Sequence, residues 1–340
     1  MTAALRQDAA PAAAPAEAPL VSVEGLTVRF KTGDGEIAAV NGVDFTLERG
    51  KVLTILGESG SGKSVTLKAM MRLHPPRRTR YGGGIRIGGR DILSLSEREL
   101  GQVRGSVVSM IFQEPMLAFD PVYTIGRQIA ETVVRHEGVS YRDAEKRALE
   151  LLELVQIPSA ARRLKAYPHE MSGGMRQRAM IALALSCRPD LLLADEPTTA
   201  LDATVQMQVL VLLRQLQREM GMAVIFVTHD MGVAAEIADH VAVMYAGRFI
   251  EAGPVGDVIG RRLHPYTEGL LASTVHGASR GERLQTIPGA PPNLARLPAG
   301  CSFAPRCRYV EARCRETDVP LFRPAPDHTA RCLRIDRERS

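Results

Sequence analysis

The stretch that decides the fold of this 340-residue chain is Gly57-Glu58-Ser59-Gly60-Ser61-Gly62-Lys63-Ser64. It matches the pattern G-x-x-x-x-G-K-[ST], in which glycines let the backbone point its N–H groups inward at phosphate oxygens. A strand-like run at 51–56 leads into the loop, and a helix-like run at 65–70 follows it. The helix adds the positive end of its dipole. We therefore expect Lys63 to reach the β- and γ-phosphates of a nucleotide and Ser64 to ligate Mg²⁺.

The composition is that of a globular chain with a basic excess. Apolar residues make up 45% and charged residues 24%, and the net charge is +5. A modest excess of this kind fits a solvated surface as well as nucleic acid or an anionic membrane. No stretch approaches the roughly 18 apolar residues of a membrane span, so a membrane role would come through partners. Residues 1–19 are rich in Ala and Pro, which predicts a disordered tail, no secretion signal and a cytosolic protein.

Further strand-like runs end in residues suited to nucleotide chemistry. One apolar run leads directly to Asp195 and Glu196, another is followed shortly by His229, and a third by Gln113. Because functional groups of open α/β sheets gather beyond the carboxyl ends of the strands, we expect these side chains to lie together. Asp195 would hold Mg²⁺ and Glu196 would polarise the attacking water. Gln113 would sense the metal and the water, and His229 would sense the γ-phosphate.

Two other features each have two interpretations. Ser172-Gly173-Gly174 opens a predicted helix, whose free N–H groups could bind an anion or could form a plain N-cap. Phe30 ends a predicted strand, where its ring could stack on adenine or pack against the protein. The residues themselves do not choose between these interpretations.

The regions between the motifs are predicted from periodicity. Apolar residues within 143–155 recur at i, i+3, i+4 and i+7, which predicts a helical insertion over about 124–164. The prolines at 75–76 and the glycines at 82–84 predict a linker after the loop helix. Strands are predicted at 21–30 and 37–47.

Taken in order, these segments resemble the ATP-binding cassette of ABC transporters over about residues 21–253. By that resemblance, residues 57–64 are the Walker A loop and Gln113 is the Q-loop residue that, with Ser64, ligates Mg²⁺. Ser172-Gly173-Gly174 is the signature core, and residues 191–196 are Walker B with Glu196 as catalytic base. Asp202 belongs to the D-loop, and His229 is the switch histidine. The resemblance implies that the residues contacting ATP and Mg²⁺ are Phe30, Gly57, Glu58, Ser59, Gly60, Ser61, Gly62, Lys63, Ser64, Val65, Gln113 and Asp195.

One position departs from the common signature, because Met175 stands where many cassettes have Gln. The peptide-importer branch often carries this Met, so the departure marks the branch. Catalytic positions Lys63, Glu196 and His229 hold the expected residue types, which implies a hydrolysis-competent subunit and argues against a purely regulatory cassette.

The implied fold is α/β. It is an ABC-type P-loop ATPase with a mixed core sheet, an antiparallel β subdomain and a helical subdomain at about 114–180. The chain would divide into a tail at 1–19, a cassette at 20–255 and a small Cys-containing extension at 256–340.

The tail holds four cysteines, Cys301, Cys307, Cys314 and Cys332. Clustered thiols in a reducing compartment indicate a zinc or iron–sulfur site, although the gaps match neither zinc-finger nor ferredoxin spacing, and free thiols remain an alternative. This region resembles the C-terminal part of oligopeptide and dipeptide importer ATPases, most closely at 300–307. That resemblance implies a [4Fe–4S] cluster on the four cysteines, with Zn²⁺ as the alternative.

The resemblance implies a subunit that hydrolyses ATP to ADP and phosphate to power import of di- or oligopeptides. It would sit peripherally on the cytoplasmic face of the membrane against two transmembrane permease subunits. A second ATPase subunit, a paralogue or an identical copy, would present its signature motif to the bound ATP, and an extracytoplasmic peptide-binding protein would supply the cargo.

Two alternatives stay open. One is an importer ATPase for nickel or another small solute, since such importers share part of the tail. The other is a soluble ABC ATPase acting on nucleic acid, which would need coiled coils, two cassettes or interleaved basic and aromatic patches. Aromatic residues are only 4% of this chain, and no nucleic-acid partner is expected.

Overall fold

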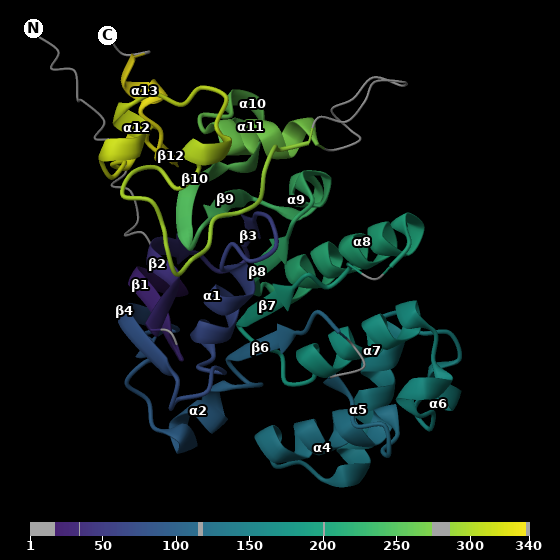
Figure 1. The fold of residues 1–340 in the computed structure, drawn as a ribbon. Helices are drawn as coiled ribbons and strands as arrows, with labels where there is room; N and C mark the ends of the chain where they lie inside the picture. The colour runs from purple at the N-terminus through teal and green to yellow at the C-terminus, as the bar shows by residue number, and fades with distance from the viewer. Residues whose placement is uncertain (1–17, 34, 115–117, 200, 274–285, 338–340) are drawn as a thin grey trace, which may run out of the picture.

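The computed structural model describes residues 18–33, 35–114, 118–199, 201–273 and 286–337. Figure 1 shows a central mixed sheet with a smaller antiparallel sheet on one side and a group of helices on the other. Most of the predicted N-terminal tail, residues 1–17, lies outside the described residues. The predicted fold, with its mixed core sheet, antiparallel part and helical part, is confirmed.

The main sheet contains eight strands within the described ranges, in the order β11-β12-β10-β9-β3-β8-β7-β6. These strands are β3 (Val52–Leu56), β6 (Val108–Ile111), β7 (Leu191–Asp195), β8 (Ala223–Thr228), β9 (His240–Tyr245), β10 (Arg248–Pro254), β11 (Phe322–Ala325) and β12 (His328–Ala330). The five strands from β9 to β6 run parallel, and the others pair antiparallel. The parallel strands β3, β6, β7 and β8 therefore end at the same edge, as the sequence predicts.

The smaller sheet is antiparallel, in the order β2-β1-β4-β5. Its strands are β1 (Val21–Thr32), β2 (Gly35–Leu47), β4 (Thr79–Ile87) and β5 (Arg90–Asp91).

The linker predicted at 82–84 is wrong, because these glycines lie inside β4. Gly83 has a φ of +80°, and a Cβ there would lie 2.4 Å from the carbonyl oxygens of Glu24 and Gly25. The pairing of β1 with β4 shifts register between Glu24 and Thr27. The glycines therefore permit a β-bulge with close backbone contact, not a linker.

Twelve α-helices lie within the described residues. They are α1 (Lys63–Met70), α2 (Glu97–Val103), α4 (Ile125–Glu137), α5 (Tyr141–Leu154), α6 (Ala160–Arg163), α7 (Gly173–Leu185), α8 (Ala203–Met220), α9 (Met231–Ile237), α10 (Val255–Arg261), α11 (Pro265–Ala272), α12 (Arg313–Glu316) and α13 (Arg334–Arg337). Helices α4 to α6 confirm the predicted helical insertion, and α7 lies with them at the lower right of Figure 1.

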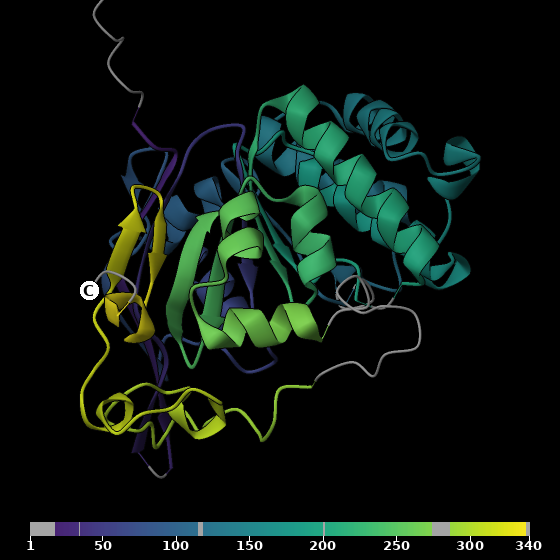
Figure 2. The same ribbon diagram turned by 90° about the horizontal axis from the view of Figure 1, so that it is seen from above.

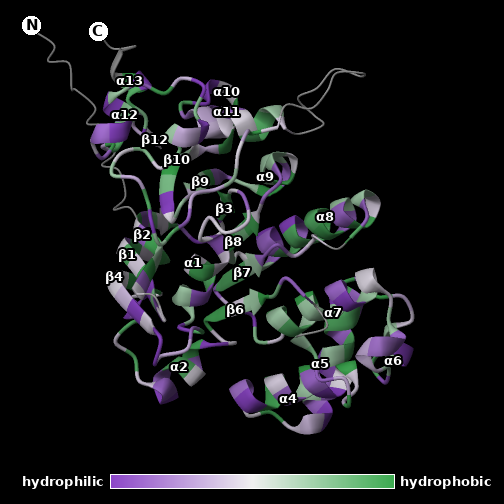
Figure 3. Cartoon of the chain, viewed as in Figure 1, coloured by the Kyte–Doolittle hydropathy of each residue, from purple (hydrophilic) through white to green (hydrophobic). Residues whose placement is uncertain are grey.

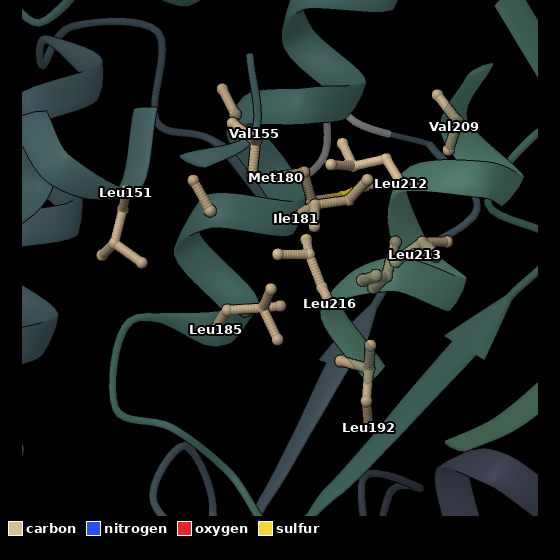
Figure 4. Packing of buried hydrophobic residues seen from close by; sticks show 14 of the residues in the cluster. Leu151, Val155, Met180, Ile181, Leu185, Leu192, Val209, Leu212, Leu213 and Leu216 are labelled. Carbon is tan, nitrogen blue, oxygen red and sulfur yellow. The ribbon is translucent and has the colours of Figure 1, made fainter. Parts of the chain in front are cut away.

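A continuous apolar core joins the helical part to the sheet. Met180 and Ile181 of α7 lie close to Leu212 of α8, above Leu192 of β7, and Leu151 of α5 belongs to the same buried cluster (Figure 4). Hydrophobic residues concentrate in the central strands, while the outer faces of the helices carry polar residues (Figure 3). In the described part of the chain, none of the helices combines the length and apolar character that a bilayer crossing requires.

The C-terminal residues join the main sheet. Ala330 of β12 pairs with Glu251 of β10, and Thr329 pairs with Ala252. Figure 2 shows this yellow strand pair beside the green strands of the sheet. The C-terminal strands therefore extend the main sheet.

Candidate functional site

The phosphate-loop motif forms the turn between β3 and α1, and its glycines are required by close contacts. A Cβ on Gly57 would lie 2.3 Å from the carbonyl oxygen of Met244, and one on Gly62 would lie 2.6 Å from that of Ala39. Gly62 has a φ of +109° and precedes the first residue of α1, Lys63. The loop is therefore pressed against β9 and β2, with the helix N-terminus directed at its interior.

Lys63 folds back over this loop. Its ammonium group donates to the carbonyl oxygens of Gly57 at 2.7 Å and Glu58 at 2.9 Å. The side chain is 4% exposed, and burial lowers the pKa of Lys63 while Glu196 opposes that shift. A nearly buried ammonium at the N-terminus of a helix is suited to anionic phosphate.

Two serines of the loop, Ser61 and Ser64, are buried and half-buried, respectively. The Ser61 hydroxyl is buried and has no hydrogen-bond partner within the described residues. Ser64 donates a hydrogen bond of 2.7 Å to Asp195 at the end of β7. Burial raises the pKa of Asp195, and the Ser64 hydrogen bond works against that rise. A hydroxyl beside a carboxylate is a donor set suited to Mg²⁺ beside a phosphate.

Glu196 lies at the centre of the remaining side chains. Its backbone has a φ of +45°, an uncommon conformation for a residue with a side chain. Its carboxylate accepts a hydrogen bond of 2.9 Å from Thr199 and lies 3.4 Å from His229 Nδ1. Gln113 Nε2 donates to the same carboxylate at 3.4 Å, and Lys63 Nζ lies 3.8 Å away.

The hydrogen bond between Glu196 and His229 shifts the pKa values of both groups. The hydrogen bond from His229 lowers the pKa of Glu196, and Thr199 and Lys63 lower it further. The same hydrogen bond raises the pKa of His229. The carboxylate is therefore ionised and held by several donors, as a group that positions water must be.

The structure thus brings together Lys63, Ser64, Gln113, Asp195, Glu196 and His229, which the sequence predicts to share one site. Phe30 contacts His74 edge to face, with ring centroids 5.1 Å apart, and its stacking on adenine stays a prediction. Asp202 caps α8 by accepting from the N–H groups of Thr204 and Val205.

The signature turn lies at the start of α7, apart from this group of side chains. Ser172 is exposed, and its hydroxyl accepts a hydrogen bond of 3.3 Å from the Met175 N–H. Gly173 is exposed as well. The serine is therefore a helix N-cap, and the turn faces outward where another molecule can reach it.

The four cysteines line one cavity in the C-terminal region, together with His264 and Phe303. Burial raises the pKa of Cys332 to about 11 and also raises the pKa values of Cys301 and Cys307. Across the described residues, no group of three or more His, Cys, Asp or Glu side chains is arranged so that it could hold a metal ion. The metal site predicted from these cysteines is therefore not confirmed.

Three residues that contact the site were not assigned a role from the sequence. Thr199 donates a hydrogen bond to the Glu196 carboxylate. The Tyr266 hydroxyl accepts a hydrogen bond of 2.8 Å from the Glu58 N–H, and Arg306 forms an ion pair of 2.6 Å with the Glu58 carboxylate. Thr199 follows the acidic pair by three residues, a spacing that could have suggested it. Tyr266 and Arg306 lie more than 200 positions from the loop, and nothing local indicates such contacts.

Comparisons with known proteins agree with this geometry. The family model described as ABC transporter matches residues 40–199, and the model described as oligopeptide/dipeptide transporter, C-terminal region, matches residues 250–314. A protein of Brucella abortus (strain 2308) named as a peptide import ATP-binding protein is 49% identical over 315 residues, covering 93% of this chain and 95% of the relative. A similarly named protein of Brucella melitensis biotype 1 is 48% identical over the same length.

Solved structures show the same likeness. A dimeric ATP-binding cassette in a post-hydrolysis state with ADP and Pi matches with a TM-score of 0.62 and 30% identity, over 69% of this chain and 98% of that one. The cbiO1 protein from Clostridium perfringens, part of an ABC transporter complex, matches with a TM-score of 0.62 and 27% identity, over 72% of this chain and 92% of that one.

Proposed function

The chain belongs to the ABC transporter family of ATPases, and we propose that it powers peptide import by hydrolysing ATP at the sheet edge that carries Lys63, Asp195 and Glu196. The observation that carries the proposal is the meeting of a phosphate loop with two acids and a histidine at one edge of the sheet. The peptide cargo follows from the C-terminal family match and from the names of the Brucella relatives.

ATP would bind with its phosphates inside the loop of residues 57–64. The inward ammonium of Lys63 and the unpartnered hydroxyl of Ser61 support this assignment, because both would gain phosphate oxygens as partners. Ser64, Asp195 and Gln113 would hold Mg²⁺, which when bound neutralises charge on the phosphates. Phe30 would lie against the adenine.

Glu196 would act as the general base for hydrolysis. Its low pKa keeps the carboxylate ionised, and Thr199 and Gln113 fix its orientation. It would accept a proton from the attacking water, while His229 would contact the γ-phosphate. Lys63 would stabilise the negative charge that moves onto the leaving phosphate oxygens.

A second cassette would complete the site. The outward-facing turn Ser172-Gly173-Gly174 would cap ATP held by the partner subunit, and the partner's turn would cap ATP held here. Closure on ATP and reopening after hydrolysis would then move the membrane partners. One of the solved relatives is itself a dimeric cassette, which supports this arrangement.

The membrane partners would be two permease subunits, with an extracytoplasmic peptide-binding protein delivering cargo. The chain would sit peripherally on the cytoplasmic face, with residues 20–255 as the cassette, its helical subdomain at about 114–180 toward the permease, and 256–340 as the extension. A nickel or other small-solute importer is the alternative. The peptide names of the relatives favour peptides over it.

The four cysteines would bind a [4Fe–4S] cluster. Two thiolates on one zinc ion lie about 3.8 Å apart, as Zn–S bonds of about 2.3 Å require, whereas a cluster spreads its thiolates over several iron atoms. The observation that supports four thiolate ligands is that the four cysteines line one cavity. Anaerobically purified protein should absorb visible light and Cys307→Ser should bleach it, while unchanged colour and iron content would contradict the cluster.

The functional proposal is tested by co-purifying the chain with its membrane partners. Subunit composition is read by mass spectrometry, and the ATPase rate is measured with the binding protein empty, loaded with peptide, or loaded with nickel. Copurified permease subunits and stimulation by the peptide-loaded protein alone support peptide import. A chain that arrives alone or with nucleic acid contradicts it.

A further inference from the structure

Glu58, the second residue of the phosphate loop, is held by Lys63 of the same loop and by two distant parts of the chain. Its carbonyl oxygen accepts from Lys63, and its N–H donates to the Tyr266 hydroxyl on α11. Its carboxylate accepts two hydrogen bonds from Arg306, at 2.6 and 2.9 Å. The conformation of the loop therefore depends on contacts outside the loop.

Arg306 is unusually well fixed for an arginine. Its side chain is 4% exposed, and Nε donates to the carbonyl oxygen of Pro288 at 2.8 Å. Nη1 also reaches the hydroxyl of Tyr245 at 3.3 Å. The bonds to Glu58 raise the pKa of Arg306, so the guanidinium stays charged. A two-point Arg–carboxylate pair fixes orientation as well as distance.

The backbone that carries Arg306 belongs to the four-cysteine segment, which we define as residues 301–332. Arg306 immediately precedes Cys307 at the end of a 3₁₀ turn (Ala304–Arg306). The turn is tied to Cys301, whose carbonyl oxygen accepts from the Ala304 N–H at 2.9 Å. The Cys301 N–H in turn donates to the carbonyl oxygen of Cys314 at 2.8 Å. A change in how the cysteines are held would therefore move the guanidinium.

We propose that Arg306 is a positioning residue for nucleotide binding, which holds the phosphate loop through Glu58 and couples the four-cysteine segment to the ATP site. Two effects act in the same direction. Arg306 fixes the loop, and its charge neutralises a carboxylate that would otherwise repel the phosphates. This inference rests on the proposed ATP site.

The test measures affinity for a fluorescent ATP analogue with Mg²⁺ on the full chain. Lys63→Ala should abolish binding, which checks the ATP site itself. Arg306→Ala should raise Kd at least about fivefold, the lower end of measured coupling between protein sites. Hydrogen exchange of the amides of residues 57–64 should become faster in the same variant. Arg308→Ala is the matched control. Arg308 lies two residues after Arg306 in the sequence, and its guanidinium forms an exposed ion pair with Glu268.

A second substitution separates positioning from general loss of structure. In Arg306→Ala, adding Glu58→Gln removes the unbalanced negative charge, so the double variant should bind more tightly than Arg306→Ala alone. A merely structural role predicts no such recovery. Should Arg306→Ala not fold, Arg306→Lys carries the test, because it keeps the charge and loses the two-point geometry. Wild-type affinity and exchange in Arg306→Lys would then overturn the proposal.

The link to the cysteines is tested by Cys307→Ser in two backgrounds. It should raise Kd in the wild-type chain and have no added effect in Arg306→Ala. Equal effects in both backgrounds would show that the coupling bypasses Arg306. If Lys63→Ala abolishes binding but Arg306→Ala changes Kd by less than about fivefold, the inference is wrong and the ATP site still holds. If Lys63→Ala leaves binding intact, the proposed ATP site itself is wrong.

Discussion

Replacing Glu196 with Gln should stop ATP turnover without weakening ATP binding. The amide has nearly the same shape as the carboxylate and can still accept the hydrogen bond from Thr199, which is 2.9 Å long. It cannot accept a proton from water. The side chain is 12% exposed and sits among Lys63, His229 and Gln113, so few solvent molecules can replace the lost base.

The expected magnitude follows from these contacts. General base catalysis contributes about 10²- to 10⁴-fold, so kcat should fall by that factor, which is about 3 to 5 kcal/mol of activation free energy. Binding should respond in the opposite direction. Removing a nearly buried negative charge close to the phosphate loop reduces repulsion of the nucleotide, so Kd should stay equal or fall.

The assay combines phosphate release with the Kd of a fluorescent ATP analogue. Glu219→Gln is the matched control, because it makes the same chemical change on an exposed carboxylate that accepts a hydrogen bond from Gln215. Thr199→Val should lower kcat by a smaller factor, since it removes one hydrogen bond and keeps the base. Retention of more than about a tenth of wild-type kcat in Glu196→Gln would refute Glu196 as the base.

Three further predictions follow from the structure. The hydrogen bond to Glu196 raises the pKa of His229, so the charged pair is fully present below the ordinary histidine pKa and is lost as pH rises through the raised pKa. In Glu196→Gln, an NMR titration of His229 should show a lower pKa than in the wild-type chain. Burial alone would raise the pKa of Asp239, but bonds from Arg214 and the Val52 N–H lower it overall. Asp239→Asn should therefore lower the free energy of unfolding in urea by about 1–3 kcal/mol at pH 7. This difference from the wild-type chain should disappear as pH falls below about 4 and through the lowered pKa of Asp239. A difference that persists unchanged at low pH would contradict the prediction. Leu213→Ala, at a site 2% exposed between α8 and the sheet, should cost about 2–5 kcal/mol by leaving a cavity, and a loss below about 1 kcal/mol would show that the core closes around it.

The catalytic edge could be predicted because its signals are local. A phosphate loop is recognised from eight consecutive residues, and an apolar strand that ends in Asp195 and Glu196 places both acids at the edge where the loop lies. The prediction of a linker at the glycines 82–84 is wrong, because glycine occurs in both linkers and β-bulges, and only the pairing with β1 distinguishes them. The contacts of Glu58 could not be predicted from the sequence, for another reason. Its partners come from α11 and from the four-cysteine segment, and no periodicity links them to the loop.

The position of β12 beside β10 also governs how the chain can be shortened. A parallel-sheet ATPase has two open edges, and unpaired N–H and C=O groups there can recruit strands from other molecules. In this chain the last residues cover one of those edges, since β12 bonds to β10 and β11 follows it outward. Glu251 on β10, 1% exposed, also receives hydrogen bonds from Leu263 and His264 and contacts His328 at 2.9 Å. Cutting the chain after β10 would expose the edge of that strand and leave the Glu251 carboxylate without its contacts to Leu263, His264 and His328, so we expect the shortened protein to self-associate.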